Sequence, residues 1–191
     1  MSHAQLDLFN PGDTLPEGLR YRPRLISRAE ETRLVGAIAE LRFKPFEFHG
    51  YLGKRRVVSF GWRYDYSLRA VGQAAPIPDF LEPVRARAAA FAGLPAAELR
   101  QVLITEYEAG AGIGWHRDKP MFGEVIGLSL LSPCTLRFRR ATKDGWERRS
   151  LKPEPGSAYL LQGPARAEWE HSIPGVKARR YSVTFRRYLG D

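Results

Sequence analysis

The sequence predicts an α+β protein in which helices precede a run of short antiparallel strands. Two stretches of helical hydrophobic spacing lie in the first half of the chain, and alternating, strand-like stretches fill the second half. Glycine, proline and charged residues separate these strands. Because antiparallel strands of this length fold readily into two packed sheets, we expect a jelly-roll (double-stranded β-helix) core with N-terminal helices.

Two helices are expected, at residues 28–42 and 79–94. Ser27 and Glu30 form a capping box at the start of the first helix, and apolar residues follow it at helical spacing. Gly93 and the proline two residues later end the second helix, whose alanine-rich face can pack on a sheet.

The strands are expected in two groups. Residues 46–49 and 56–60 are strand-like runs separated by glycines, which indicates a hairpin between the two helices. From Gln101 onward, short alternating runs predict strands at about 101–107, 125–131, 135–140, 147–151, 157–161 and 179–187.

Length and composition, 191 residues with 43% hydrophobic, fit one domain with a substantial core. We expect this domain over residues 21–191, after an N-terminal arm at residues 1–20. The single Cys134 excludes an internal disulfide and a cysteine zinc cluster, which fits a reducing compartment. The sequence has neither an apolar run of membrane-spanning length nor a signal peptide, so we expect a cytoplasmic protein. We also expect a monomer.

The chain is strongly basic, with a formal net charge of +9 and an isoelectric point near 10.0. This balance favours an acidic partner, and nucleic acid is the commonest such partner of a basic domain. The alternative is a sequence that uses arginine on ordinary solvated faces.

A candidate metal site combines His116 and Asp118 with the distant His171. In an extended segment, residues i and i+2 point the same way, so His116 and Asp118 can reach one ion. Two histidines and one carboxylate form the facial triad of non-haem iron(II) oxygenases, which leaves coordination positions open for cosubstrate and oxygen. Taken alone, a His-x-Asp is common by chance, and an isolated histidine such as His171 is more often bonded to backbone.

Arg180 and Arg186 lie in a stretch that alternates as a strand does, and their even spacing places both guanidiniums on one face. The planar guanidinium binds carboxylates bidentately, so such a pair can grip a dicarboxylate such as 2-oxoglutarate. The alternative is a basic edge strand that faces water. Together with the candidate metal site, the two arginines indicate an iron oxygenase.

From about Val102 to Tyr188 the chain resembles the AlkB family of iron(II)/2-oxoglutarate-dependent dioxygenases. The segment Ile-Thr-Glu-Tyr-Glu-Ala-Gly at 104–110 is similar to the family strand that precedes the iron site. The resemblance implies Fe(II), 2-oxoglutarate and O2 as cofactor and cosubstrates. It also implies iron ligands at His116, Asp118 and His171, and cosubstrate contacts at Tyr107, Arg180 (to the distal carboxylate) and Arg186 (near the other end).

Two positions depart from the family pattern. Thr105 stands where family members often carry a cosubstrate-binding asparagine, and its hydroxyl can still donate a hydrogen bond. Pro120 stands where base-repairing members carry an acidic residue that helps read the damaged base. The second departure leaves the substrate open.

Basic and aromatic residues interleave at Lys54-Arg55-Arg56 and at 62–66, a region that resembles the family's substrate lid, here a β-hairpin. Cations bind phosphates while aromatic faces stack bases. The candidate substrate-binding residues are Arg55, Arg56, Trp62, Tyr64 and Trp115. The alternative is that Trp62 and Tyr64 pack on the core as strand residues, and that Trp115 and Trp169 are core aromatics.

The N-terminal arm contains Gln5-Leu6-Asp7-Leu8-Phe9, which resembles the short peptide with which bacterial repair proteins dock on the DNA sliding clamp. A terminal segment is free to be captured, and its leucines and phenylalanine can anchor in apolar pockets. The alternative is that the arm folds back and buries Leu6, Leu8 and Phe9 on its own domain.

The resemblance implies a reaction in which 2-oxoglutarate is decarboxylated to succinate while a methyl group on nitrogen is hydroxylated and lost as formaldehyde. The leading hypothesis is demethylation of an alkylated base in DNA or RNA, as in alkylation damage repair. The second is demethylation or hydroxylation of a protein side chain, because Pro120 and residues 123–133 resemble a family branch with protein substrates. The third is a non-catalytic nucleic-acid-binding module, against which the complete set of ligands and arginines argues.

Overall fold

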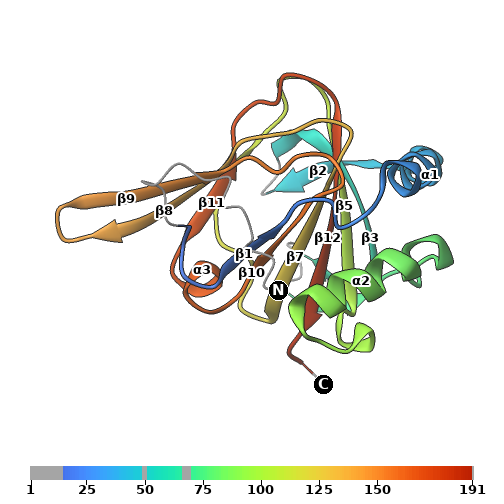
Figure 1. The fold of residues 1–191 in the computed structure, drawn as a ribbon, viewed down its shortest axis with the longest axis horizontal. Coiled ribbons are helices and arrows are strands. Elements are labelled where there is room, and N and C mark those ends of the chain that lie inside the picture. The colour runs from blue at the N-terminus through green and yellow to red at the C-terminus, as the bar shows by residue number, and fades with distance from the viewer. Residues whose placement is uncertain (1–14, 49–50, 66–69, 191) are drawn as a thin grey trace, which may run out of the picture.

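The computed structural model describes residues 15–48, 51–65 and 70–190 (Figure 1). The helices are α1 (Arg28–Ala39), α2 (Glu82–Ala92) and the short α3 (Gly163–Ala167). The strands are β1 (Leu19–Arg22), β2 (Lys44–Phe48), β3 (Tyr51–Asp65), β4 (Ala70–Gln73), β5 (Gln101–Tyr107), β6 (Ile113–His116), β7 (Phe122–Leu130), β8 (Leu136–Thr142), β9 (Gly145–Leu151), β10 (Ala158–Leu161), β11 (Glu170–Ile173) and β12 (Arg180–Tyr188).

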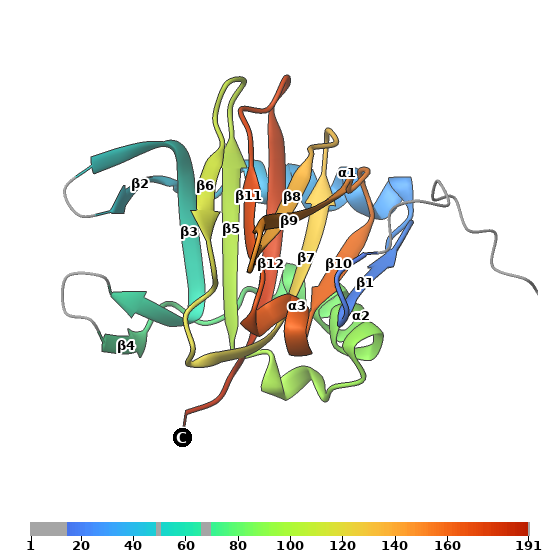
Figure 2. The same cartoon turned by 90° about the vertical axis from the view of Figure 1, so that its left-hand side faces the viewer.

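Two antiparallel sheets form the core. The large sheet has the order β1-β10-β7-β12-β5-β3-β2, with β4 added to β3, and the small sheet has the order β6-β11-β8-β9. Figure 2 shows the large sheet face-on, with the small sheet in front of it and α1 and α2 behind. Non-consecutive strands pair in both sheets, as a jelly roll requires, so the predicted double-sheet core with N-terminal helices is confirmed.

The two main helices start and stop as the sequence chemistry predicts, with shorter ends. The capping box is present at α1, where Ser27 Oγ accepts from the Glu30 backbone and Glu30 accepts from the Ser27 backbone. Helix α1 ends at Ala39 and not at 42, because the Leu41 N–H turns back to the Ile38 carbonyl in a tighter closing turn. Gly93 ends α2 in the left-handed conformation, at φ 74°.

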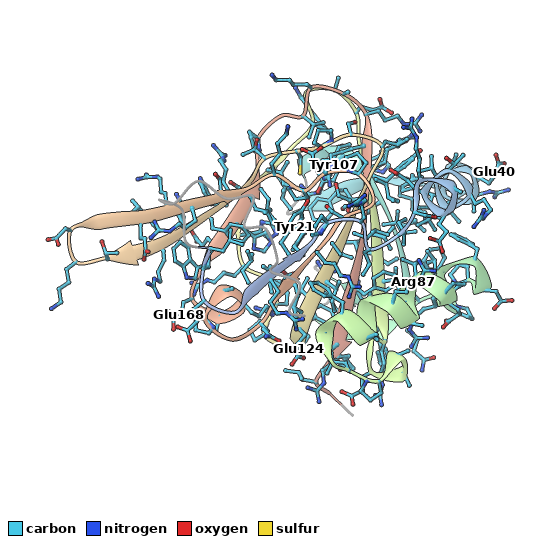
Figure 3. All side chains as sticks on the ribbon, viewed as in Figure 1. Tyr21, Glu40, Arg87, Tyr107, Glu124 and Glu168 are labelled. Carbon is cyan, nitrogen blue, oxygen red and sulfur yellow. The ribbon has the colours of Figure 1, made fainter. Side chains whose placement is uncertain are left out.

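Two apolar clusters fill the space on either side of the large sheet. One lies under α1 and α2 and includes Ile38, Leu81 and Ile104. The other lies between the two sheets and includes Tyr107 and Phe138. Figure 3 shows Tyr107 within the interior, whereas Glu40, just after α1, and Glu168, just after α3, lie at the surface. The cleft between the sheets is therefore apolar apart from the residues described below.

Several elements were not predicted, or were predicted too short. The short strands β1, β4, β6 and β11, none of them expected, carry too few residues for a clear alternation. Strand β3 runs from Tyr51 to Asp65 where only 56–60 was expected. The central part of β3 is held by seven consecutive pairs with β5, a long-range constraint that a local pattern does not reveal. Among the described residues, none of the helices combines the length and apolar character needed to cross a membrane.

Candidate active site

Two predicted iron ligands lie side by side on the small sheet. His116 ends β6, His171 lies in β11, and the two residues are partners in the antiparallel ladder. The centroids of their imidazole rings are 4.2 Å apart. Asp118 follows His116 by two residues, and its Oδ2 lies 3.7 Å from Nε2 of His171. The three side chains expected at the iron therefore meet at one place.

Burial controls the protonation of the two histidines. It lowers the pKa of His116, and it lowers the pKa of His171 to about 3, with the neighbouring His116 adding to the effect. Nδ1 of His116 lies 2.9 Å from the Gly114 carbonyl oxygen, a contact that favours hydrogen on Nδ1 and leaves the Nε2 lone pair free. Both imidazoles are thus neutral at neutral pH, the form that binds a metal.

An arginine holds Asp118 as a carboxylate. Nε and Nη2 of Arg186 lie 2.8 and 2.7 Å from Oδ1 of Asp118, and Nη1 donates to Oε1 of Gln101 at 2.8 Å. Burial, the largest single effect, raises the pKa of Asp118. The positive charges around it, Arg186 first and then His171, His116 and Arg166, together outweigh burial, so this pKa lies well below its usual value. The prediction that Arg186 lies near one end of 2-oxoglutarate stays untested; in the structure its guanidinium binds Asp118 and Gln101.

Two neutral imidazoles and a carboxylate are the donor set of a facial-triad iron(II) site. Within the part of the chain that the structure describes, no group of three or more His, Cys, Asp or Glu side chains is closed tightly enough to surround a metal as it stands. Oδ1 of Asp118 is turned to Arg186, while Oδ2 faces His171. The donors fit iron(II) in kind.

Arg180 is a buried cation with spare hydrogen-bonding capacity. It is 1% exposed, and its Nη2 donates to Ser129 Oγ at 3.0 Å. Its Nε and Nη1 are buried and have no hydrogen-bond partner among the described residues. A buried guanidinium left in this state costs several kcal/mol, and a carboxylate is the partner that satisfies it best. The site therefore fits one carboxylate of 2-oxoglutarate.

The residues around Arg180 come from neighbouring strands. Arg55, Tyr107 and Arg180 are register partners across β3, β5 and β12, so their side chains share one face of the large sheet. The Arg180 guanidinium lies 5.0 Å from the centre of the Tyr107 ring. Thr105 is two residues before Tyr107 and therefore on the same face, where it is 4% exposed. The structure thus gathers the predicted cosubstrate residues Thr105, Tyr107 and Arg180.

Tyr159 belongs to the same pocket and was not predicted. It pairs with Gly127 across β10 and β7, and a Cβ on Gly127 would lie 2.2 Å from Cζ of the Tyr159 ring. Glycine is therefore required at 127 for the ring to lie flat on the sheet. Burial first, and Tyr107 second, raise the pKa of Tyr159, which keeps its hydroxyl protonated and able to donate. In the sequence, the one indication of this packing was a glycine inside an expected strand.

A pocket of about 750 Å³ opens beside Asp118. Arg166 of α3 fixes its wall, since its guanidinium donates to the carbonyls of Lys119, Phe122 and Gly123 at 2.6, 2.7 and 3.1 Å. These three bonds secure the loop that follows Asp118. The side chains around the pocket mouth include Arg117, Lys119, Pro120, Glu124, Arg166 and Arg187.

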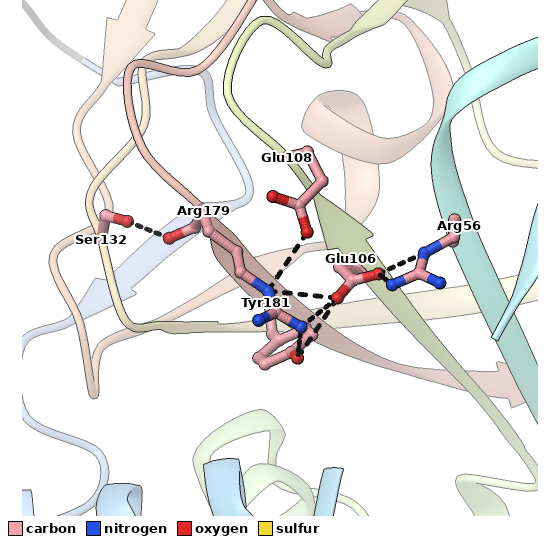
Figure 4. Close-up of polar contacts among 6 residues, drawn as sticks. All are labelled: Arg56, Glu106, Glu108, Ser132, Arg179 and Tyr181. Atoms are coloured by element: carbon pink, nitrogen blue, oxygen red, sulfur yellow. Dashed lines mark hydrogen bonds and ion pairs between the residues drawn. The ribbon is translucent and has the colours of Figure 1, made fainter. Parts of the chain in front are cut away.

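Arg56 lies on the opposite face of the large sheet from His116. Its partner in the β3–β5 ladder is Glu106, which is 1% exposed and binds Arg56 at 2.5 Å from Nε to Oε2. The same carboxylate accepts from Arg179 and from the Tyr181 hydroxyl, at 3.3 Å for the latter (Figure 4). Arg56 is thus a structural cation, and of the two predicted lid arginines Arg55 faces the site.

The aromatic residues singled out in the sequence lie in different places. Trp62 stacks on Tyr188 with ring centroids 4.9 Å apart. Trp115 precedes His116 in β6 and therefore points to the other face of the small sheet. Trp169 is a core residue, 2% exposed. The Tyr64 side chain lies outside the described part of the chain. For Trp169, the core interpretation matches the structure, whereas the substrate role of Trp62 stays a prediction.

Comparison with known proteins agrees with this geometry. The family described as the 2OG-Fe(II) oxygenase superfamily matches residues 23–186. An Arabidopsis thaliana protein named "Alkylated DNA repair protein ALKBH8 homolog" is 29% identical over 89% of this chain and 58% of its own length. A Bos taurus protein, "Alpha-ketoglutarate-dependent dioxygenase alkB homolog 7, mitochondrial", is 32% identical over 80% of this chain and 65% of its own length.

The fold comparison points the same way. The solved structure "The structure of OsALKBH1" matches with a TM-score of 0.69 at 16% identity, covering 92% of this chain and 98% of that one. The chain spans about three fifths of the length of the two named sequence relatives. The facial donor set, the buried arginine and the matched family together make this chain an AlkB-like member of the 2OG-Fe(II) oxygenase superfamily, whose members use Fe(II), 2-oxoglutarate and O2.

Proposed function

We propose that the protein is an oxidative demethylase of N-alkylated bases in nucleic acid. His116, Asp118 and His171 would hold the iron, and Arg180 would bind the distal carboxylate of 2-oxoglutarate. The observation that carries this assignment is the buried Arg180 guanidinium with two unpartnered nitrogens, in the cleft next to a His-Asp-His donor set. Iron, cosubstrate and oxygen supply the oxidation that removes the methyl group.

The protein's own residues bind and orient the reactants. Ser129 positions the Arg180 guanidinium, and the hydroxyls of Thr105, Tyr107 and Tyr159 would donate hydrogen bonds to the bound cosubstrate. Arg186 keeps Asp118 ionised and fixes the carboxylate's orientation. The apolar cluster between the sheets excludes water from the cleft.

Three features favour a nucleic-acid substrate. The chain carries a net charge of +9, one relative is named for repair of alkylated DNA, and cations surround the pocket beside Asp118. Arg55 adds a cation on the same face as Tyr107 and Arg180. A base that leaves its stack to reach the iron needs phosphate contacts to hold the flanking strand, which these residues can provide.

Mass spectrometry of N-methylated single-stranded DNA and RNA oligonucleotides tests the proposal directly. The oligonucleotides are incubated with protein, iron(II), 2-oxoglutarate and oxygen, and succinate is followed in parallel. Loss of one methyl group from an oligonucleotide, abolished in D118A and retained in the control R33Q on α1, is the expected result. If the wild-type protein forms no succinate and demethylates no oligonucleotide, the enzyme assignment is refuted.

A second candidate is oxidation of a protein side chain. Pro120, which lines the pocket beside Asp118, is the observation that favours it, because an acidic residue that could read a base is missing there. The same assay separates the two functions: succinate formation without oligonucleotide demethylation is the result expected of a protein substrate.

The clamp-docking hypothesis concerns Gln5, Leu6, Asp7, Leu8 and Phe9, which lie outside the described residues. It stays a prediction, as do the cytoplasmic location and the monomeric state. Deletion of residues 1–9 should abolish pull-down by a sliding clamp and leave succinate formation unchanged. If succinate formation is lost as well, the arm folds back on its own domain.

A further inference from the structure

The outer face of the small sheet carries an alternating stack of arginines and tryptophans. The Arg139 guanidinium lies between two indoles, 4.5 Å from the centre of Trp115 and 4.2 Å from the centre of Trp146. Arg137 adds a second cation to Trp115 at 5.0 Å. This face is the reverse of the one that carries His116 and His171, because neighbouring strand residues point to opposite sides.

Polar contacts on adjacent strands hold the stack in place. Nε of Arg139 donates to Glu170 Oε2 at 2.6 Å, and Nε of Arg137 donates to Ser172 Oγ at 3.1 Å, as expected for register partners of β8 and β11. Each guanidinium therefore has one edge bound to the protein and a planar face against an indole. Such fixed guanidiniums lose little conformational freedom when they bind an anion.

Folding does not explain why this face is so basic. Arg139 and Arg148 are direct partners in the β8–β9 ladder, an arrangement of like charges that destabilises a sheet. On this face of β8, β9 and β11, the three arginines Arg137, Arg139 and Arg148 stand against one carboxylate, that of Glu170. Trp146 is 44% exposed and is one of three exposed large apolar side chains among the described residues. Charge repulsion and an exposed indole on one hairpin both favour an external anionic, aromatic partner.

We propose that the outer face of the β6-β11-β8-β9 sheet binds the nucleic-acid strand that flanks the substrate base. Phosphates lie against Arg137 and Arg148, and an unpaired base stacks on the free face of Trp146. This inference rests on the proposed nucleic-acid substrate and gives that strand a second contact, remote from the iron. Alternating cations and aromatic rings match alternating phosphates and bases, whereas an acidic peptide offers carboxylates without rings.

Fluorescence anisotropy with a labelled single-stranded oligonucleotide, titrated at several salt concentrations, tests the surface in the full chain. R137Q/R148Q should weaken binding and reduce the slope of log affinity against log salt by about 1.4, or ~0.7 for each lost phosphate contact. W146A should weaken binding roughly tenfold and leave the slope unchanged. The control R28Q/R33Q removes two exposed cations from α1, at the other end of the molecule (Figure 1), and should change neither quantity.

The outcomes separate this inference from the proposed function. Wild-type affinity and slope in both surface variants would overturn it, even if the enzyme demethylates oligonucleotides. Loss of binding to poly-glutamate with oligonucleotide binding intact would also overturn it, and would identify an acidic protein partner. If no oligonucleotide is demethylated, the demethylase assignment fails while the anisotropy result still stands. Unchanged thermal unfolding of the variants shows that the fold is preserved.

Discussion

Replacement of Glu106 by Gln tests whether the buried carboxylate at the back of the large sheet stabilises the fold. Glu106 is 1% exposed and joins β3 to β12 through Arg56 and Arg179, with Tyr181 as a third donor. The substitution keeps the shape of the side chain and removes its charge. Two arginines then lose their shared anion at once.

The expected loss follows from burial. Removing one partner of a fully buried ion pair costs about 3–5 kcal/mol. The Arg56 and Arg179 side chains are each 48% exposed, so water solvates the charges that E106Q leaves behind. We therefore expect a smaller loss, about 2 kcal/mol of unfolding free energy. For a chain of this length, that loss lowers Tm by about 4–8 °C.

Urea denaturation of E106Q and of E108Q is the matched measurement. Glu108 lies two residues further along, carries the same charge and pairs with the same Arg179 at 3.3 Å, but its side chain is 57% exposed. E108Q should therefore cost at most about 0.5 kcal/mol. Equal losses in the two variants would refute the reasoning, because burial would then make no difference to the value of the carboxylate.

Three further outcomes are expected. Hydrogen bonds from Arg87 first and then Ser27 lower the pKa of Glu30 from 4.5 to about 2, so the stability that Glu30 adds is present above pH 4.5 and lost as pH falls towards 2. The difference in urea midpoint between wild type and E30Q should shrink over that range, and a constant difference would contradict this assignment. G127A places a Cβ against the Tyr159 ring, so it should lower the free energy of unfolding in urea by about 1–3 kcal/mol and weaken 2-oxoglutarate binding. The control Gly36→Ala in α1, where a Cβ meets open space, should do neither. R180Q should weaken the affinity for 2-oxoglutarate, measured by calorimetry, by roughly 10- to 100-fold, which is the contribution of a charge-assisted hydrogen bond. R179Q, on the opposite face, should change this affinity little, and equal effects of the two variants would place the cosubstrate elsewhere.

The central residues of the candidate site could be predicted from the sequence because their arrangement depends on local spacing along single strands. The two-residue spacing of His116 and Asp118, and the even spacing of Arg180 and Arg186, depend only on the alternation of an extended chain. The same alternation could have excluded Trp115, since the neighbour of an inward-facing His116 points outward. It also shows that only one of two adjacent lid arginines can face the cleft, without showing which one.

The remaining parts of the site depend on register between distant strands. Tyr159 reaches the cosubstrate pocket because β10 pairs with β7 at Gly127, and Ser129 and Gln101 meet the two arginines across β7, β12 and β5. No local pattern specifies these pairings. The contact between Arg186 and Asp118 has the same origin, because it becomes visible only when β12 and the loop after β6 are placed in space.

Strand β5 serves both the chemistry and the stability of the protein. Thr105 and Tyr107 face the cleft, and Glu106 between them faces the helices and ties β3 and β12 together. Because the two faces are separated by one peptide unit, the carboxylate network stabilises the strand that carries the cosubstrate residues without entering their pocket. E106Q should therefore lower stability while 2-oxoglutarate binding at 25 °C stays within about twofold of wild type, since the register of seven β5–β12 pairs survives the loss of one charge. A large loss of binding in folded E106Q would mean that the network, and not the ladder, positions Tyr107 and Arg180.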